Sequence, residues 1–196
     1  MKLLLVRHGQ TRFNLERRFL GRTDLELDEE GCRQASLLAE VYRGQGRVYS
    51  SPLRRAMQTA AGLGSPIAVP GLMEMDMGEL EGLSREEMED RFPGLLSTWF
   101  DDPTHFRPPG GETLAETQER GWQALQEILE DGSEEVKVVV THQLLLAGVL
   151  CRLSDVPLSK FRKFSHGNTG VTTLERGPAG LRIARLNDLA HLPPAP

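Results

Sequence analysis

Leu3-Leu4-Leu5-Val6-Arg7-His8-Gly9 is the stretch that decides the fold, together with Val136-Lys137-Val138-Val139-Val140-Thr141-His142. Each contains a short apolar run that is bounded by charge and is too short for an independent helix. Such runs are typical of strands buried on both faces of a parallel sheet. Both strands lead into a histidine, and open parallel sheets bind ligands just beyond the carboxyl ends of their strands. We therefore expect the two imidazoles to share one crevice.

Further strands and helices alternate along the chain with these two. Short strands are expected over residues 47–49 and 66–70, the second near a sheet edge because prolines bracket it, and a terminal hairpin over 171–174 and 181–186. Helices are expected over 28–42, 51–61, 113–130 and 144–153. Strands that alternate with helices predict an α/β fold, a three-layer α/β/α sandwich with a mainly parallel central sheet.

Composition and charge narrow the classes of function. The chain has 196 residues, 39% of them hydrophobic and 26% charged, which is typical of one globular domain. Its formal net charge is −5, so there is no basic field for nucleic acid or an anionic membrane. Two cysteines, Cys32 and Cys151, are too few for a disulfide framework and lack the spacing of zinc ligands. With no apolar stretch of signal-peptide or membrane-spanning length, we expect a cytoplasmic protein.

A cluster of cationic side chains is needed if this acidic chain handles an anion. Ser51-Pro52-Leu53-Arg54-Arg55 predicts a strand end that turns into a helix, with Pro52 in the first turn. Arg54 then lies near a helix N-terminus, where backbone N–H groups and a guanidinium favour phosphate. Spacing alone does not separate Arg54 from Arg55, and of the two we expect Arg55 to face solvent. Periodicity likewise does not choose among the four carboxylates of residues 72–82, which include Glu74.

Short motifs follow one another in order over nearly the whole chain: Arg7-His8-Gly9-Gln10-Thr11 with Asn14, residues 21–24, 31–35, 51–60 and 74–82, Gly110-Gly111-Glu112-Thr113, and Val140-Thr141-His142. This series resembles the histidine phosphatase superfamily, which includes cofactor-dependent phosphoglycerate mutases and many small phosphatases. The closing Leu186-Asn187-Asp188 is similar to the ends of its small phosphatases, such as α-ribazole phosphatase-like proteins. The resemblance implies a phosphoglycerate mutase-like fold as a single domain over 1–196, with an insertion at about 75–112 that forms a lid on the substrate side.

The resemblance also implies roles, position by position. His8 is the expected nucleophile that becomes phosphohistidine, Glu74 is the proton donor, and Arg7, Arg54 and His142 hold the phosphoryl group. Supporting substrate contacts are implied for Thr11, Asn14, Gly21 and Gln143. In-line phosphoryl transfer needs a positioned nucleophile and cationic donors, and Arg and His supply these, so we expect neither a metal nor a cofactor.

Three points qualify this site. The attacking nitrogen of His8 must be neutral, so we expect the other ring nitrogen to bond a backbone carbonyl near Gly9. The family often has glycine after its second histidine, where this chain has Gln143. Leu20 replaces the small hydroxyl residue that mutases tend to carry, which predicts a less polar pocket wall.

Three functions fit these residues, and the leading hypothesis is a phosphomonoesterase acting on a small phosphorylated metabolite. The segment from Arg85 to Thr113 is short and acid-rich, whereas mutases usually carry a longer insertion with extra basic residues. A phosphoglycerate mutase is the alternative, because it shares the phosphohistidine. A phosphate-binding module without catalysis is less expected, because such modules typically lose a catalytic residue and His8, Glu74 and His142 all persist here. A homodimer is a further expectation.

Overall fold

A twisted sheet forms the centre of the computed structural model, which describes residues 1–132, 134–177 and 180–193. Within these ranges its six strands lie in the order β3-β2-β4-β1-β5-β6. The strands are β1 (Lys2–Arg7), β2 (Arg47–Ser50), β3 (Ile67–Ala68), β4 (Val136–Thr141), β5 (Val171–Gly177) and β6 (Gly180–Asp188). The first four strands are parallel to one another, while β5 is antiparallel to β1 and β6 is antiparallel to β5. The expected mainly parallel sheet with a terminal hairpin is confirmed; Pro178 and Ala179 of the hairpin turn lie outside the described residues.

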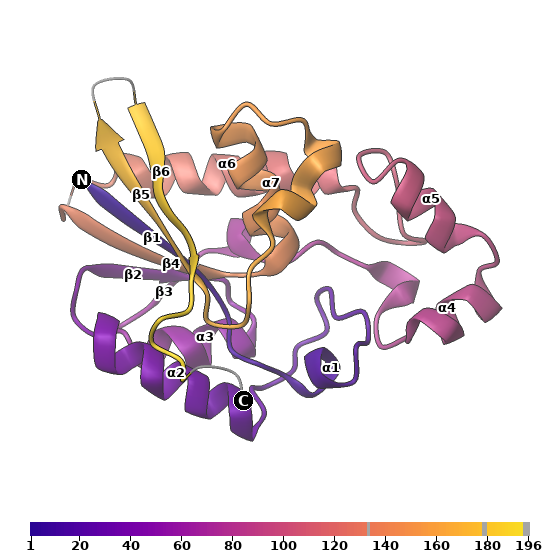
Figure 1. Ribbon diagram of the computed structural model, residues 1–196, viewed down its shortest axis with the longest axis horizontal. Helices are drawn as coiled ribbons and strands as arrows, with labels where there is room; N and C mark the ends of the chain where they lie inside the picture. The colour runs from indigo at the N-terminus through magenta and orange to yellow at the C-terminus, as the bar shows by residue number, and fades with distance from the viewer. Residues whose placement is uncertain (133, 178–179, 194–196) are drawn as a thin grey trace.

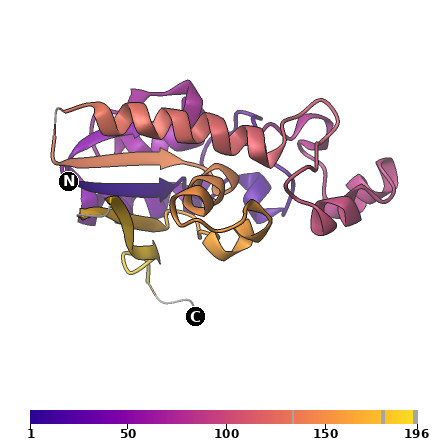
Figure 2. The ribbon, with the colours of Figure 1, turned by 90° about the horizontal axis from the view of Figure 1, so that it is seen from above.

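Helices cover both faces of this sheet (Figures 1 and 2). One face carries α2 (Glu29–Tyr42) and α3 (Arg54–Ala61), and the other carries α6 (Leu114–Glu130) and α7 (Gln143–Leu153). The shorter elements are α1 (Arg12–Leu15), η1 (Pro70–Leu72), η2 (Gly78–Leu80), α4 (Arg85–Arg91), α5 (Leu95–Asp101) and η3 (Leu158–Phe164). None of the helices in the described ranges is both long and apolar enough to cross a membrane.

The alternation of side chains along β1 divides the core into two layers. Leu4 and Val6 belong to the apolar cluster on the α2 and α3 face, and Leu3 and Leu5 to the larger cluster on the α6 and α7 face. All four are at most 1% exposed, because successive residues of a strand point to opposite faces and helices cover both. The central apolar runs therefore fix the three-layer architecture.

Helix boundaries follow local capping. Asp28 accepts a hydrogen bond from the Gly31 N–H at the start of α2, and Thr113 caps α6, so two expected helices are confirmed. Helix α3 begins later than expected, at Arg54, because Leu53 keeps an extended conformation and its N–H bonds the Ser51 hydroxyl.

The carboxyl ends of β1 and β4 meet at one edge of the sheet. These strands are neighbours in parallel register, with Arg7 opposite Thr141. Helices α1, α4 and α5 gather beyond this edge, on the right of the ribbon in Figure 1. The two histidines that follow the strands therefore emerge side by side.

Candidate active site

His8 and His142 lie next to each other at this edge. Their ring centroids are 5.1 Å apart, and the His8 N–H donates to the Thr141 carbonyl oxygen at 3.0 Å. His8 is 3% exposed and His142 is fully buried. The two rings are neighbours because their strands pair in parallel, but His8 alone of the two lines the cavity described below.

The hydrogen bonds of His8 define its tautomer. Its Nδ1 lies 2.7 Å from the Gly9 carbonyl oxygen, which only accepts, so Nδ1 carries the hydrogen and Nε2 has a free electron pair. Burial holds the pKa of His8 well below its usual value, and the nearby charges of Arg55 and Arg7 lower this pKa further. Gly9 is required here, since a Cβ at this position would lie 2.7 Å from the Gly31 carbonyl oxygen. His8 is thus a neutral imidazole with the electronic form of a nucleophile.

His142 is held through its Nε2, whereas His8 is held through its Nδ1. Its Nε2 lies 2.7 Å from the Ser51 hydroxyl, which itself accepts from the Leu53 N–H. In the tautomer in which this hydroxyl donates to Nε2, the hydrogen of the imidazole is on Nδ1. That Nδ1 is buried and has no hydrogen-bond partner among the described residues. Burial, followed by the charge of Arg55, also lowers the pKa of His142 well below its usual value. A neutral N–H donor without an acceptor fits a phosphoryl oxygen.

Two buried arginines flank the histidines. Arg7 donates from Nη1 to the His166 carbonyl oxygen at 2.6 Å, while Arg55 donates to the carbonyl oxygens of Thr23 at 2.8 Å and Gly21 at 2.7 Å. The Nε atoms of both arginines are buried without a partner in the described part of the chain. Burial lowers the pKa of Arg7 and brings that of Arg55 to about 10, so both remain cations at neutral pH. This is the local positive charge that an acidic protein needs for an anionic ligand.

The expected placement of Arg54 is wrong. Its side chain is 56% exposed, pairs with Glu26 and lies outside the cavity that contains His8. Arg55 is fully buried instead and takes the place expected for Arg54. The signal that separates them is the stripe of small side chains one, four and five residues after Arg55, which are buried with it on one face of α3: Ala56, Thr59 and Ala60.

Glu74 follows η1 and reaches the N-terminus of α7. Its carboxylate accepts hydrogen bonds from the backbone N–H groups of Leu144 and Leu145, both at 3.1 Å, and from that of Met75 at 2.9 Å. Its main chain is held from behind, because the Arg120 guanidinium donates to the Glu74 carbonyl oxygen at 3.3 Å. These contacts place a carboxylate at the mouth of the histidine crevice, where it can exchange a proton with a bound ligand.

Glu112 organises the support behind Glu74. Its carboxylate accepts from Arg22 at 2.7 Å and from Arg120 at 2.9 Å, and it also receives the Asp76 N–H at 3.2 Å. One glutamate thereby connects three segments that surround the Glu74 backbone. The Gly110-Gly111-Glu112-Thr113 motif thus contributes a structural anchor rather than a group in the cavity.

One cavity of about 480 Å³ brings most of the expected residues together. The expected site residues that line it are Arg7, His8, Asn14, Gly21, Glu74 and Gln143. Thr11 is fully buried and does not line the cavity; it caps α1, and its hydroxyl donates to the Asn14 amide oxygen at 3.1 Å. Gln143 turns its amide oxygen to the His166 N–H at 2.8 Å, and Leu20 contributes to the wall.

Several further residues line the cavity, and few of them could be singled out from the sequence. Phe19, Trp99, Phe161 and Arg162 line the cavity from α5, η3 and the loop after α1. His166 also lines it, with its ring bonded on both sides and its carbonyl oxygen holding Arg7. These residues come from segments far apart in the sequence, so only the tertiary structure assembles them.

Comparisons with known proteins agree with this geometry. The family model described as histidine phosphatase superfamily (branch 1) matches residues 3–189. A phosphoserine phosphatase of Hydrogenobacter thermophilus is 31% identical over 98% of this chain and 94% of its own length. A probable phosphoglycerate mutase of Yersinia pestis is 31% identical over 98% of this chain and 95% of its length. The solved structure of a mycobacterial glucosyl-3-phosphoglycerate phosphatase superposes with a TM-score of 0.85 at 31% identity, covering 95% of this chain and 98% of that one.

Proposed function

Because this chain belongs to the histidine phosphatase superfamily, we propose that it hydrolyses a phosphate monoester of a small metabolite through a phosphohistidine on His8. The observation that carries the proposal is the neutral, buried His8 with its free Nε2, flanked by the buried cations Arg7 and Arg55. A neutral imidazole is the nucleophile, and the guanidinium groups stabilise the charge that spreads over the phosphoryl oxygens.

In the first step, Nε2 of His8 forms a bond to phosphorus while the bond from phosphorus to the ester oxygen breaks. The hydrogen bond from Nδ1 to the Gly9 carbonyl oxygen holds the ring and stabilises the positive charge that develops on it. Arg7, Arg55 and the free Nδ1–H of His142 bind the phosphoryl oxygens. The carboxyl group of Glu74 gives a proton to the leaving alcohol.

In the second step, the carboxylate of Glu74 takes a proton from water, and the resulting oxygen nucleophile attacks phosphorus. The bond from phosphorus to His8 breaks, which releases inorganic phosphate and restores the neutral imidazole. The three backbone N–H groups that donate to Glu74 hold the carboxylate in place for this step. Neither step needs a charge beyond those of the named side chains.

The first test is hydrolysis of p-nitrophenyl phosphate by the wild type and by His8→Ala. We expect kcat/KM to fall by about a thousandfold or more in the variant, because the nucleophile is removed. The matched control is His105→Ala, because that histidine side chain is 82% exposed and lies outside the cavity. Acid-labile phosphate trapped on wild type but not on the variant would identify the intermediate. An unchanged rate in His8→Ala would overturn the proposal.

A mutase shares the first step and differs in the acceptor of the phosphoryl group. The cavity that holds Glu74 adjoins a second, open cavity, which supports access of water to the phosphohistidine. Incubation with 3-phosphoglycerate distinguishes the two, since a phosphatase releases inorganic phosphate and a mutase forms the 2-isomer.

Three further expectations belong to this proposal. Residues 75–112, which contribute Met77 and Trp99 to the cavity, act as its substrate-side lid. The two free thiols, Cys32 and Cys151, support a reducing compartment such as the cytoplasm, and fractionation of expressing cells tests this. A homodimer stays a prediction that light scattering of the purified protein would test.

A further inference from the structure

The closing motif of the chain, Leu186-Asn187-Asp188, forms the end of β6 and lines neither the cavity that contains His8 nor the open cavity beside it. Its asparagine contacts the loop of residues 166–170, which lies between η3 and β5. This 166–170 loop in turn contacts the main chain that follows β1. The motif is therefore connected to the nucleophile through a single loop.

The 166–170 loop holds the main chain of the nucleophile. The His8 carbonyl oxygen accepts the Thr169 N–H at 3.2 Å and the side-chain amide of Asn168 at 3.1 Å. The Gly170 carbonyl oxygen accepts the Arg7 N–H at 3.2 Å. The His8 N–H bonds the neighbouring strand β4 instead. The peptide groups of His8 are thus fixed by the loop and by β4.

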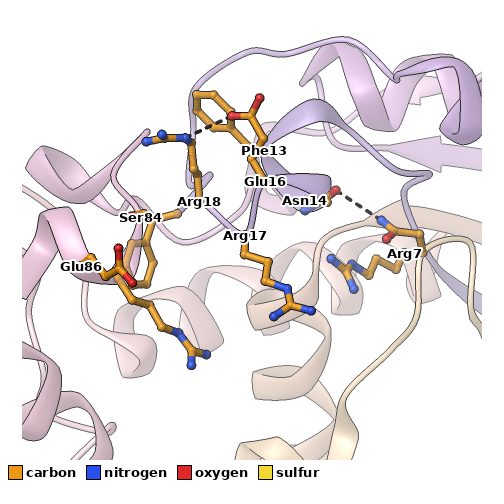
Figure 3. Close-up of a pocket in the computed structure, with 11 residues that line it drawn as sticks. Arg7, Phe13, Asn14, Glu16, Arg17, Arg18, Ser84 and Glu86 are labelled. Carbon is orange, nitrogen blue, oxygen red and sulfur yellow. Dashed lines mark hydrogen bonds and ion pairs between the residues drawn. The ribbon is translucent and has the colours of Figure 1, made fainter.

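The same loop holds two side chains that line the cavity with His8. The His166 carbonyl oxygen accepts from Nη1 of Arg7 at 2.6 Å. The Asn168 amide also donates to the Asn14 amide oxygen at 3.4 Å, and Figure 3 marks this contact as the dashed line from Asn14. A shift of the loop would therefore displace the nucleophile together with groups that face its substrate.

The backbone of the loop is strained at Thr169. Its φ of 58° lies in the left-handed region, which β-branched residues rarely adopt. Strained conformations persist only where surrounding contacts over-determine them, and they cluster at functional sites. The Thr169 hydroxyl contacts the Asn168 carbonyl oxygen at 2.7 Å and Nε2 of His191 at 2.9 Å. The loop therefore depends on support from the C-terminal segment.

Asn187 supports the turn of the loop. Its amide oxygen accepts the Gly167 N–H at 3.0 Å, and its own N–H donates to the Thr172 hydroxyl at 3.0 Å. Its φ of 49° is left-handed, a conformation that asparagine tolerates better than most residues. Gly170 leaves room for the amide, since a Cβ there would lie 2.2 Å from the amide oxygen. Asn187 is therefore fitted against both ends of the turn.

Residues after Asn187 connect the loop to helix α2. The His191 ring meets the Tyr42 ring of α2 edge-on, with their centroids 6.3 Å apart. Leu189 packs against Gly167, where a Cβ would lie 3.0 Å from the nearest leucine methyl group. The closing segment of residues 187–191 thus fastens the loop to the body of the fold.

We propose that this closing segment positions the nucleophile: Asn187 and His191 fix the 166–170 loop, and the loop fixes the main chain of His8. Neither Asn187 nor His191 lines the cavity, so both are positioning residues. The kinetic consequence rests on the proposed function. A reacting atom misplaced by about 1 Å costs about a hundredfold in rate, so partial loosening of the loop should cost about tenfold.

Variants of Asn187 test the first contact. Asn187→Gly removes the acceptor and keeps the left-handed conformation accessible, whereas Asn187→Asp keeps an acceptor oxygen. With p-nitrophenyl phosphate we expect Asn187→Gly to lower kcat about tenfold and to change KM less than about threefold, and Asn187→Asp to regain most of the loss. The control on the same strand is Arg182→Gln, because the Arg182 side chain is 68% exposed and pairs with Glu175. A wild-type kcat in folded Asn187→Gly, no recovery in Asn187→Asp, or an equal loss in the control would overturn the proposal.

Variants of His191 test whether both residues act through the same loop. His191→Leu should also lower kcat about tenfold, and His191→Gln should recover part of it, because its amide can donate or accept near the position of Nε2. Residues that share one network have non-additive effects. The double variant Asn187→Gly with His191→Leu should therefore lose much less than the product of the two single losses. A loss equal to that product would show two independent effects and contradict the shared route.

Hydrogen exchange separates failure of this inference from failure of the proposed function. If the wild type hydrolyses no phosphate monoester, the phosphatase proposal fails, and amide exchange of the protein alone still tests the positioning. Asn187→Gly should speed exchange of the Arg7 and Thr169 amides by about tenfold, because these N–H groups join the loop to the nucleophile, while Leu5 in the centre of β1 changes much less. Unchanged exchange at Arg7 and Thr169, or equal acceleration at Leu5, would reject the positioning role independently of turnover.

Discussion

The neighbouring arginines of α3 allow a sharp test of the site, because one is buried in it and the other is not. Arg55→Met removes a guanidinium that donates to the Thr23 carbonyl oxygen at 2.8 Å and to the Gly21 carbonyl oxygen at 2.7 Å. Methionine keeps a long apolar side chain, so the change removes charge and donors more than volume. Arg54→Met is the control, because this residue is the preceding one on the same helix and its side chain is 56% exposed.

Two effects of Arg55→Met differ in size. Leaving two carbonyl oxygens without their donor costs about 1–3 kcal/mol each, and removing a desolvated charge offsets part of this, so we expect the free energy of unfolding to fall by about 2 kcal/mol. Loss of one preorganised donor to a developing oxyanion costs about 10²–10³ in rate, or about 2.7–4 kcal/mol. The catalytic loss should therefore exceed the loss of stability.

Hydrolysis of p-nitrophenyl phosphate gives kcat/KM, and urea unfolding at the same temperature gives stability. We expect Arg54→Met to keep kcat/KM within about threefold of wild type, since exposed ion pairs contribute little. Arg55→Lys should lie between Arg55→Met and wild type, because an ammonium keeps the charge but not the fork of donors. If Arg55→Met retained wild-type kcat/KM while folded, or Arg54→Met lost as much, Arg55 would not bind the phosphoryl group.

Two further predictions concern stability and positioning. Burial lowers the folded-state pKa of His8, His142 and His166, the last to about 4. Below about pH 6.5 the unfolded chain binds protons that the folded chain does not, so the free energy of unfolding is highest above this pH and falls below it, by up to about 1.4 kcal/mol per pH unit for each histidine. Urea unfolding midpoints measured from pH 7 to 5 should show this fall, with a shallower slope in His166→Asn. A midpoint that does not change with pH would contradict the prediction. Glu112→Gln should lower kcat by about tenfold and change KM much less, because the substitution weakens the support of the Glu74 backbone and Glu112 does not touch substrate. Equal changes in kcat and KM, or a wild-type kcat, would show that Glu112 does not position Glu74.

The sequence was sufficient for the centre of the fold because that centre depends on local pattern. Strands β1 and β4 are buried on both faces, so apart from Lys137 their runs are apolar and hard to mistake for amphipathic helices. Their parallel pairing then brings His8 and His142 together with no further information. Helices α4 and α5, of seven residues each, were not predicted, since so short a segment gives too little periodicity.

The error at Arg54 has a physical origin. A charged residue in a helix is normally expected to face solvent, and that general preference favoured the exterior for Arg55. The structure reverses it because Arg55 finds two carbonyl acceptors in the segment around Gly21, which only the tertiary fold brings to α3. The small side chains that share its face, Ala56, Thr59 and Ala60, were the local sign that this face is covered.

The buried cations also explain why the site suits a transferable phosphoryl group. Arg7 and Arg55 are desolvated. Within the described residues, the Nε of each arginine and the Nδ1 of His142 have no hydrogen-bond partner. A buried charge or donor left unpaired is costly, so a phosphoryl group binds favourably here because its oxygens supply the acceptors and the negative charge that these groups lack. Burial first, and then the charges of Arg55 and Arg7, lower the pKa of His8 and keep it neutral before the reaction. Charge that arrives on the phosphoryl group offsets these charges and favours the positive imidazole of phosphohistidine, so one pair of arginines prepares the nucleophile and then stabilises what it becomes.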